Sequence, residues 1–267
     1  MIILEELTPY FEVRSDDFGV AELQAIYNVV NFGKDITFGS EKEPKQARDS
    51  VHTIILTGNA IRQIEKGYLS ELTQGEFNLG PKASQKYMDE WDRDWFSEYD
   101  KLPLDSKQRF DYTYIERLLV NHGDQLEELR NELKELIEKA ERAESKGKEV
   151  IVSNRHQVIT WDPKIDMGSD APPCFQRAWI RYYHPYMIDI HFSWRSRDLR
   201  NAWKYNLIGA IAGFNKEIFF PNKCKIVRII DQIDSLHIMH GVLGTAQKLL
   251  LEAQNKHPQI MRKILEY

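Results

Sequence analysis

Three long segments rich in aromatic and β-branched residues dominate the second half of this 267-residue chain. They run over 150–161, 177–194 and 225–239, and such composition is typical of β-strands. Between the last two lies an apolar segment over 203–215, whose small residues, among them Gly209 and Gly213, predict a closely packed, buried helix. Strands and helices of this kind bury their apolar faces against each other. We therefore expect an α+β fold, a large sheet with helices on one side.

The first half of the chain is less regular. Residues 21–30 have helical apolar spacing, 51–57 alternate like a strand, and 88–99 favour neither. Residues 126–140 carry an apolar stripe flanked by Glu and Lys, which predicts an amphipathic helix ending near Gly147. Because no internal repeat or polar linker divides the chain, we expect one domain over 1–267, with this helix as an insert at about 124–147.

Composition excludes several classes of protein. The chain has 29% charged residues and a net charge of −5, which does not suit a general duplex-DNA binder. We therefore do not expect a nucleic acid as a partner. No apolar run reaches the roughly 18 residues of a membrane span, so we do not expect a membrane as a partner either. The acidic start resembles no signal peptide and predicts a cytoplasmic protein. Two cysteines without a CxxC pair predict neither a disulfide framework nor a zinc site.

Two motifs carry candidate chemistry at strand ends. Cys174 follows two prolines, a stiff approach that suits a positioned nucleophile, although most free cysteines are buried hydrophobic residues. Arg195 and Ser196 open an Arg-Ser-x-Asp turn, whose guanidinium and hydroxyl suit a phosphate. The guanidinium can also lower the pKa of a nearby thiol. The alternative is a surface turn with a local ion pair.

Two further residues lie within apolar segments. Asn206 comes eleven residues after Arg195, and its paired donor and acceptor match either a pyrimidine edge or a core hydrogen bond. His237 ends the last predicted strand, where a histidine is usually a satisfied core residue.

In their order and spacing these motifs resemble the thymidylate synthase and deoxycytidylate hydroxymethylase family, in its shorter archaeal and phage-type branches. The segment PPCFQRAWIRYYHPYMIDIHFSWRSRDLRNAWKYNLIGAI resembles it closely. SNRHQVITWDP is similar to the arginine strand that precedes the cysteine, and FDYTYIERL to a Tyr-x-Tyr-Gly-x-Arg-Leu stretch, with Ile115 in place of Gly. The resemblance extends from about Phe110 to His237. It implies a thymidylate synthase-like fold, with a large mixed sheet packed on helices and a homodimer joined sheet to sheet.

The resemblance implies a role for each matching residue. Cys174 would add to carbon 6 of the pyrimidine, Tyr114 would belong to the proton-transfer network near carbon 5, and Asp198 would meet the folate. Asn206 would read the base, and Arg155 would reach the phosphate site of the other subunit. The implied substrate-binding residues are Arg14, Arg155, Arg195, Ser196, Arg197, Asn206 and His237.

Several positions depart from the family pattern. Asn154 replaces the first of two adjacent arginines, and Met239 stands where a sugar-binding Tyr is usual. Met88 falls where a shielding Trp would precede the acidic-Trp segment. The family's water-organising glutamate has three candidates: Glu71, Glu76 and Glu90.

The activity that the resemblance implies is transfer of a one-carbon unit from methylenetetrahydrofolate to carbon 5 of dUMP, giving dTMP, without a metal. The alternative is a hydroxymethylase, in which water captures the methylene group. Asn206 favours uracil, because cytosine-specific relatives resemble the pattern with Asp there, but it does not decide between hydride and water. A catalytically silent nucleotide-binding homologue is a third possibility. The choice between deoxyribonucleotide and ribonucleotide stays open.

Overall fold

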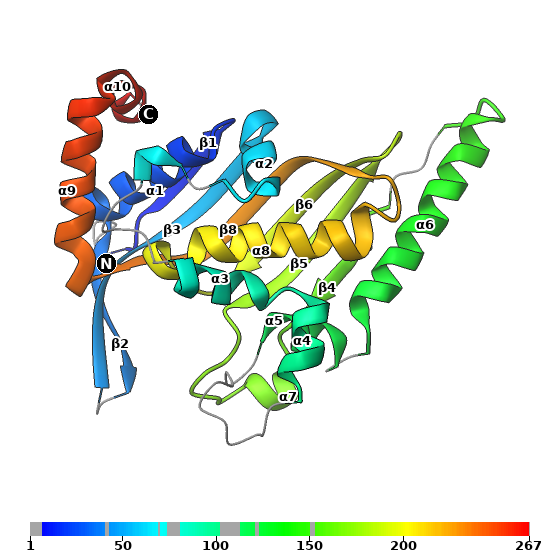
Figure 1. The fold of residues 1–267 in the computed structure, drawn as a ribbon, viewed down its shortest axis with the longest axis horizontal. Coiled ribbons are helices and arrows are strands. Elements are labelled where there is room, and N and C mark those ends of the chain that lie inside the picture. The colour runs from blue at the N-terminus through cyan, green and yellow to red at the C-terminus, as the bar shows by residue number, and fades with distance from the viewer. Residues whose placement is uncertain are drawn as a thin grey trace.

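One sheet of eight strands runs through the protein (Figure 1). The computed structural model describes residues 7–40, 43–68, 70–73, 81–101, 113–120, 123–149 and 153–266. The strand order is β1-β3-β8-β6-β5-β4, with β2 paired to β3 and β7 to β8. Pairs β1–β3 and β6–β8 are parallel, whereas β3–β8 and β5–β6 are antiparallel. The predicted large mixed sheet is therefore confirmed. The strands are β1 (Tyr10–Ser15), β2 (Lys34–Ser40), β3 (Glu43–Thr57), β4 (Gln157–Ile159), β5 (Phe175–Tyr183), β6 (Met187–Trp194), β7 (Arg197–Asp198) and β8 (Lys225–Met239).

Helices cover one face of this sheet and its ends. In Figure 1, α8 crosses the middle of the face beside α2 and α3, while α9 and α6 stand at opposite ends. None of the described helices is long and apolar enough to cross a membrane. The helices are α1 (Phe18–Phe32), α2 (Gly58–Glu65), η2 (Glu71–Thr73), α3 (Pro81–Asp89), α4 (Arg93–Tyr99), α5 (Tyr114–Leu119), α6 (Gln125–Glu144), α7 (Pro163–Asp166), the π-helical η3 (Leu199–Trp203), α8 (Lys204–Phe214), the π-helical η4 (Asn215–Phe219), α9 (His240–Lys256) and α10 (Pro258–Leu265).

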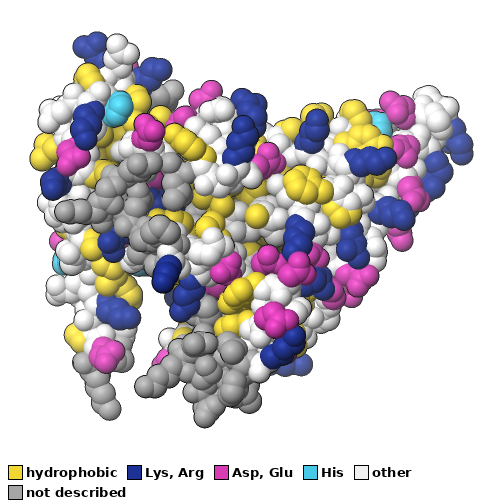
Figure 2. All heavy atoms as spheres, viewed as in Figure 1, with side chains coloured by type: hydrophobic (Ala, Val, Ile, Leu, Met, Phe, Trp, Pro, Cys, Tyr) yellow, Lys and Arg dark blue, Asp and Glu magenta, His cyan; other side chains and the backbone are white. Residues whose placement is uncertain are grey.

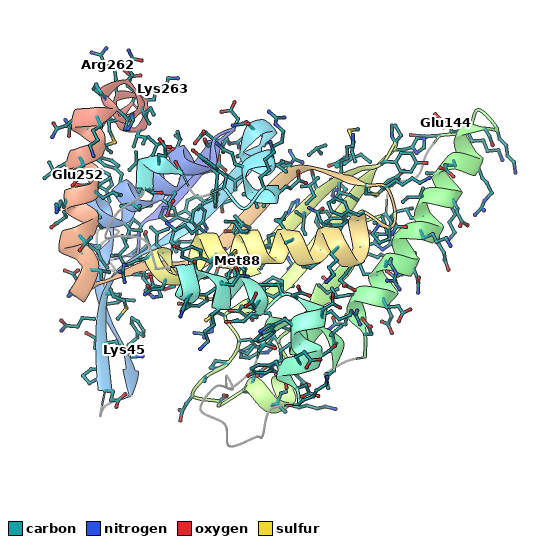
Figure 3. All side chains as sticks on the ribbon, viewed as in Figure 1. Lys45, Met88, Glu144, Glu252, Arg262 and Lys263 are labelled. Carbon is teal, nitrogen blue, oxygen red and sulfur yellow. The ribbon has the colours of Figure 1, made fainter. Side chains whose placement is uncertain are left out.

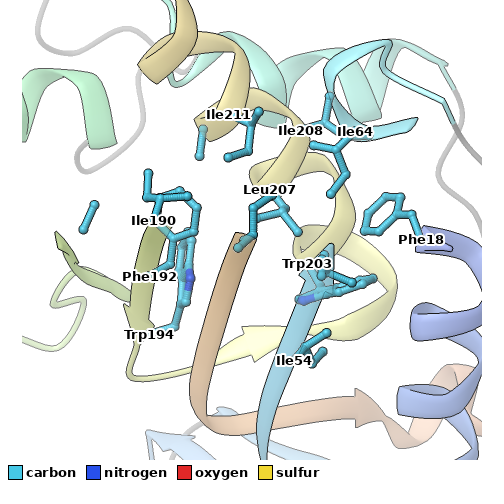
Figure 4. Packing of buried hydrophobic residues seen from close by; sticks show 14 of the residues in the cluster. Phe18, Ile54, Ile64, Ile190, Phe192, Trp194, Trp203, Leu207, Ile208 and Ile211 are labelled. Carbon is cyan, nitrogen blue, oxygen red and sulfur yellow. The ribbon is translucent and has the colours of Figure 1, made fainter. Parts of the chain in front are cut away.

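Helix α8 is the centre of the core, as its small and apolar residues predict. Leu207 and Ile211 are fully buried above the sheet, where Figure 4 shows them near the side chains of β6. A methyl group on Gly209 would lie 2.8 Å from the Trp91 ring, and one on Gly213 would lie 2.7 Å from the Trp91 carbonyl oxygen. Glycine therefore lets α8 approach the end of α3 this closely. This contact fixes the position of Trp91 and of the residue before it.

The opposite face of the sheet is only partly buried. A row of directly paired residues crosses five strands on this face: Gln157, Trp179, His191, Ile230 and Ile55. Gln157 is exposed and the other four are half-buried. Figure 1 shows no labelled helix over this face.

Two of the three predicted long strands differ from expectation. The segment 177–194 is two strands, because Pro185 lacks a backbone N–H and Tyr186 has a φ of 56°, which no strand accommodates. The segment 150–161 is a strand only over Gln157–Ile159, and 150–152 lie outside the described residues. The third segment, 225–239, is β8 as predicted. The predicted Glu/Lys-rich amphipathic helix is observed as α6, Gln125–Glu144.

Candidate functional site

The Cys174 thiol lies at the start of β5, half-exposed and next to a cation. The backbone N–H of Arg195, just after β6, donates to the Cys174 carbonyl at 2.8 Å. The guanidinium of the same arginine donates from Nη2 to the Pro172 carbonyl at 3.0 Å and lies 3.7 Å from the Cys174 Sγ. A guanidinium at this distance stabilises a thiolate. The contact is thus suited to a nucleophile activated at neutral pH.

A second pair of groups lies where β7 meets β8. Strand pairing places Asp198 opposite His237, and the Ser196 Oγ lies 3.5 Å from the His237 Nδ1. His237 is 7% exposed, and the ring of Phe38 packs on it edge-on at 5.4 Å. The fold therefore brings the Arg-Ser turn next to His237, near the end of β8.

Two polar residues beside His237 were not found by sequence reasoning. Asp49 of β3 pairs directly with His237 and accepts a hydrogen bond of 2.7 Å from the Ser235 hydroxyl. Burial raises the pKa of the Asp49 carboxyl, while Ser235 and His237 oppose that rise. No motif marks Asp49. The sequence signal that could have identified Asp49 is a carboxylate just before the alternating apolar residues of a predicted strand.

Asn206 and Tyr114 meet around Trp91. The Asn206 side chain is 3% exposed on α8, and the Trp91 Nε1 donates to its Oδ1 at 3.4 Å. The Trp91 ring lies 4.8 Å from that of Tyr114 and 5.2 Å from that of Phe175, the residue after Cys174. This aromatic cluster brings the predicted base reader and the predicted proton-transfer residue next to the thiol strand.

Glu90 is the buried carboxyl of this region. It is 7% exposed, and burial raises its pKa to about 8, with Lys86 opposing the rise. Its backbone carbonyl accepts a bond of 3.0 Å from the N–H of Ile115, which ties it to α5. Burial raises the pKa of Tyr87 as well, and the charges of Glu90 and Asp198 add to that rise, so these three groups share one region. Of the other glutamate candidates, Glu71 is exposed in η2 and Glu76 lies outside the described residues.

Asp198 and Arg197 are both engaged by the protein. The Asp198 Oδ1 accepts from the backbone N–H groups of Arg200 and Asn201, each at 2.9 Å, and so caps η3. Arg197 is 2% exposed, with its Nη1 2.7 Å from the Asp231 carboxylate and its Nη2 2.6 Å from the Trp203 carbonyl. Its guanidinium faces the core, which differs from the predicted contact with substrate.

The remaining predicted residues lie apart from this cluster. Arg14 is exposed on β1 and pairs with Glu12 at 2.7 Å. Arg155 is exposed and lines a groove of about 760 Å³ between α6 and the segment 153–156. In the contacts between described residues, neither arginine reaches Cys174 or Ser196 within one chain.

The β2–β3 hairpin lies beside the end of β8. Figure 2 shows it projecting from the molecule, with hydrophobic and Lys or Arg side chains on the visible face. Met239 pairs with Ala47 of the hairpin, so β8 carries His237 to that side. Met88, at the end of α3, lies beside α8 in Figure 3.

Comparisons with known proteins identify relatives of this chain. No protein-family model matches it. It is 30% identical over 186 residues to a protein of Methanothermobacter thermautotrophicus, covering 69% of this chain and 73% of the relative. It is 23% identical over 200 residues to one of Methanothermobacter marburgensis, covering 74% and 80%. Both relatives carry the description "Putative thymidylate synthase".

The fold is similar to that of a solved structure. Thermostable thymidylate synthase A from Bacillus subtilis superimposes with a TM-score of 0.59 at 14% identity, covering 88% of this chain and 84% of that one. The shared fold and the sequence relatives agree. The chain belongs to the thymidylate synthase family.

Proposed function

We propose that this protein transfers a one-carbon unit to carbon 5 of dUMP, giving dTMP. The observation that carries the proposal is the Cys174 thiol held 3.7 Å from the Arg195 guanidinium, in a chain of this family. Methylenetetrahydrofolate supplies the carbon unit and, for methylation, the hydride. Around the thiol, each neighbouring group has a separate task.

The thiolate starts the reaction by adding to carbon 6 of the pyrimidine, which makes carbon 5 nucleophilic. Arg195 stabilises the thiolate and, with Ser196, binds the nucleotide phosphate. His237 donates to or accepts from the sugar, next to Asp49 and its bond to Ser235. Met239 occupies the position of the usual Tyr and has no hydroxyl to offer the sugar. Asp49 and Ser235, next to His237, are the polar groups proposed to hold the sugar hydroxyl instead.

The base is read by the Asn206 amide. Its Nδ2 donates to the carbonyl at position 4, and its Oδ1 accepts from the ring N–H. The Trp91 N–H points at the Oδ1 and disfavours the flipped amide, which would set donor against donor. This bond favours uracil over cytosine.

Proton transfers are assigned to Glu90 and Tyr114. With its pKa raised to about 8, Glu90 is mostly protonated at neutral pH and can give a proton to the base through an organised water. Tyr114, whose ring lies 4.8 Å from that of Trp91, serves the proton leaving carbon 5. Asp198, half-exposed beside Tyr87, is the residue proposed to meet the folate.

A hydroxymethylase is the second candidate, favoured by one observation. Met88 replaces the shielding Trp at the end of α3, two residues before Glu90 and in contact range of α8. One assay separates the candidates: the protein is incubated with dUMP, UMP, dCMP or CMP plus methylenetetrahydrofolate, and the product is identified by mass. A gain of CH₂ supports methylation, a gain of CH₂O supports hydroxymethylation, and no product with any nucleotide contradicts both.

The proposal includes a homodimer joined through the half-buried sheet face, with Arg155 completing the partner's phosphate site. Arg155→Ala and Cys174→Ser should each be inactive alone. In a 1:1 mixture about half of the dimers are mixed and each holds one intact site, so about a quarter of the activity should return. Arg195→Ala mixed with Cys174→Ser is the control, because both defects concern a subunit's own site and no intact site forms. No recovery in the first mixture, or turnover by a monomer, contradicts the proposal.

A further inference from the structure

A fully buried ion pair lies behind the candidate nucleophile. The Arg197 guanidinium donates from Nη1 to the Asp231 carboxylate at 2.7 Å and from Nη2 to the Trp203 carbonyl at 2.6 Å. The Trp203 Nε1 donates to the same Asp231 oxygen at 2.8 Å. The side chains of Arg197 and Asp231 are 1% and 0% exposed. These contacts fix the guanidinium in one position.

That position is close to the reacting groups. The guanidinium carbon lies 3.7 Å from the centre of the Trp194 ring, the residue before Arg195. The same ring lies 4.8 Å from that of Phe175 and 5.7 Å from that of Tyr114. Burial lowers the pKa of Arg197, while the charges of Asp231, Tyr114 and Cys174 oppose that fall. The guanidinium therefore packs on the aromatic cluster that contains Phe175, the residue next to Cys174.

Stability alone does not account for the pair. Buried ion pairs are often replaceable by apolar residues without loss, because desolvation offsets their attraction. Among the described residues, the buried Arg197 Nε has no hydrogen-bond partner, which adds to the cost. Burial raises the pKa of the Asp231 carboxyl against the opposing effect of Arg197. A costly charge beside a thiol points to a role in the chemistry.

A second buried pair provides an internal reference. The Lys204 Nζ lies 2.6 Å from the Glu22 Oε1, with both side chains 1% exposed, and joins α8 to α1. The other Glu22 oxygen accepts from the Thr73 hydroxyl at 2.5 Å. This carboxylate is bonded at both oxygens and lies on α1, away from the thiol strand. It is the matched control for burial of charge.

We propose that Arg197, anchored by Asp231, is a positioning residue that favours the thiolate form of Cys174 through space. The role rests on the proposed function only in that Cys174 is the nucleophile. Arg195 acts on the thiol from the exposed side and binds substrate, whereas Arg197 acts from the core and touches no substrate. Two guanidinium groups thus act on one thiol.

Other titratable groups lie around the same region, and the test leaves all of these residues unsubstituted. Arg195 follows β6, Tyr114 begins α5, and His237 lies near the end of β8. Glu90 and Tyr87 lie at the end of α3, and Asp198 precedes η3. None of these is altered in the variants below, so a change in the thiol reports on Arg197 and Asp231.

The test is the pH dependence of alkylation of Cys174 by iodoacetamide, with a Cys224→Ser background to leave one thiol. Arg197→Met should raise the thiol pKa by about one unit and slow alkylation at neutral pH about tenfold, because a nearby cation is lost. Arg197→Lys keeps a cation at this position, so its thiol pKa should stay close to that of the unsubstituted protein. Asp231→Asn keeps the cation and removes the opposing charge, so it should lower the thiol pKa. The two single variants therefore shift it in opposite directions.

Controls separate electrostatics from folding. Glu22→Gln should lower the melting temperature and leave the thiol pKa unchanged. The double variant Arg197→Met, Asp231→Leu replaces the pair by apolar residues and should fold while keeping the raised thiol pKa. An unchanged thiol pKa in that double variant, or equal shifts in Arg197→Met and Glu22→Gln, would overturn the inference. Because alkylation needs no nucleotide or folate, its result is independent of whether the product assay succeeds.

Discussion

Two regions of the molecule, one near the start of α8 and one beyond its end, each contain a cysteine and a buried asparagine in different conditions: Cys174 with Asn206, and Cys224 with Asn222. Beyond the far end, Cys224 is 3% exposed, and burial raises its pKa to about 12. The Asn222 Nδ2 donates to the backbone carbonyls of Arg130 and Ile218, both at 3.0 Å. That thiol is held protonated, and that amide is used to join α6 to the core.

At the near end, the same residue types stay available. Cys174 is half-exposed with a guanidinium 3.7 Å from its sulfur, and Asn206 accepts one long bond of 3.4 Å from Trp91. The difference teaches that residue type alone does not decide whether a polar group is structural or functional. Burial separates the two thiols, whereas hydrogen-bond partners separate the two buried amides. A group that the protein satisfies only in part can be completed by a substrate.

Replacing the two cysteines gives the largest contrast. Cys174→Ser should lower turnover on the order of 10⁴-fold or more, because a hydroxyl is a far weaker nucleophile at neutral pH. Cys224→Ser should keep turnover within about twofold and cost about 1 kcal/mol of stability, because it places a hydroxyl in an apolar site. Steady-state rates and thermal melts of both variants test this. Comparable rates in the two would remove the contrast between the ends.

Glu90→Gln should give the next largest effect. Loss of a positioned acid commonly costs about 10²–10⁴-fold in kcat, and the variant should lose the activity change that accompanies ionisation near pH 8. Nucleotide affinity should change little. Rate profiles from pH 6 to 9 provide the measurement, and a variant with the wild-type profile would show that another group transfers the proton.

Glu90 also predicts how stability depends on pH. Its pKa is about 8 in the folded protein against 4.5 unfolded, so between these values the folded state holds the extra proton. The contribution of Glu90 to the free energy of unfolding is full below about pH 4.5. It falls by up to about 1.4 kcal/mol per pH unit as the pH rises toward 8. Glu90→Gln should flatten this slope in urea titrations. An equally steep slope in the variant would assign it elsewhere.

The contrast between the two ends could be predicted only in part. Strand β8 follows its predicted bounds because its fifteen residues alternate without a breaker, and the spacing from Cys174 to His237 identifies the family. The inward turn of Arg197 could not be read from Arg-Ser-x-Asp. It is decided by Asp231, which lies 34 residues further along and reaches Arg197 only through the sheet.

Other misses also come from long-range packing. Glu90 stands out from Glu71 because it is buried, and it lies between Met88 and Trp91, which Gly209 and Gly213 of α8 approach closely. Asp49 depends on the pairing of β3 with β8, which local pattern does not specify. Local sequence thus predicts strands and motifs, while burial of a particular polar group depends on which elements meet.

The two asparagines predict a smaller, qualitative contrast. Asn206→Asp should shift preference from dUMP toward dCMP by about tenfold or more, because a carboxylate accepts from the cytosine amine. Asn222→Asp should leave the preference unchanged and destabilise the protein by about 2 kcal/mol, because two donated bonds are lost. Specificity constants for both nucleotides test this. A wild type that prefers dCMP, with no shift in Asn206→Asp, would show that Asn206 does not read the base.

Trp91→Phe should give the smallest effect and sharpen the comparison most. Without the indole N–H, the Asn206 amide can flip, and its oxygen then faces the cytosine amine. One hydrogen bond of this kind is worth about 1 kcal/mol, so the ratio of dUMP to dCMP specificity should fall about two- to tenfold. Trp95→Phe is the matched control, since Trp95 stacks on Tyr99 with ring centres 4.6 Å apart. An unchanged ratio in Trp91→Phe would mean that another bond holds the amide, and the availability of Asn206 would then need a different explanation.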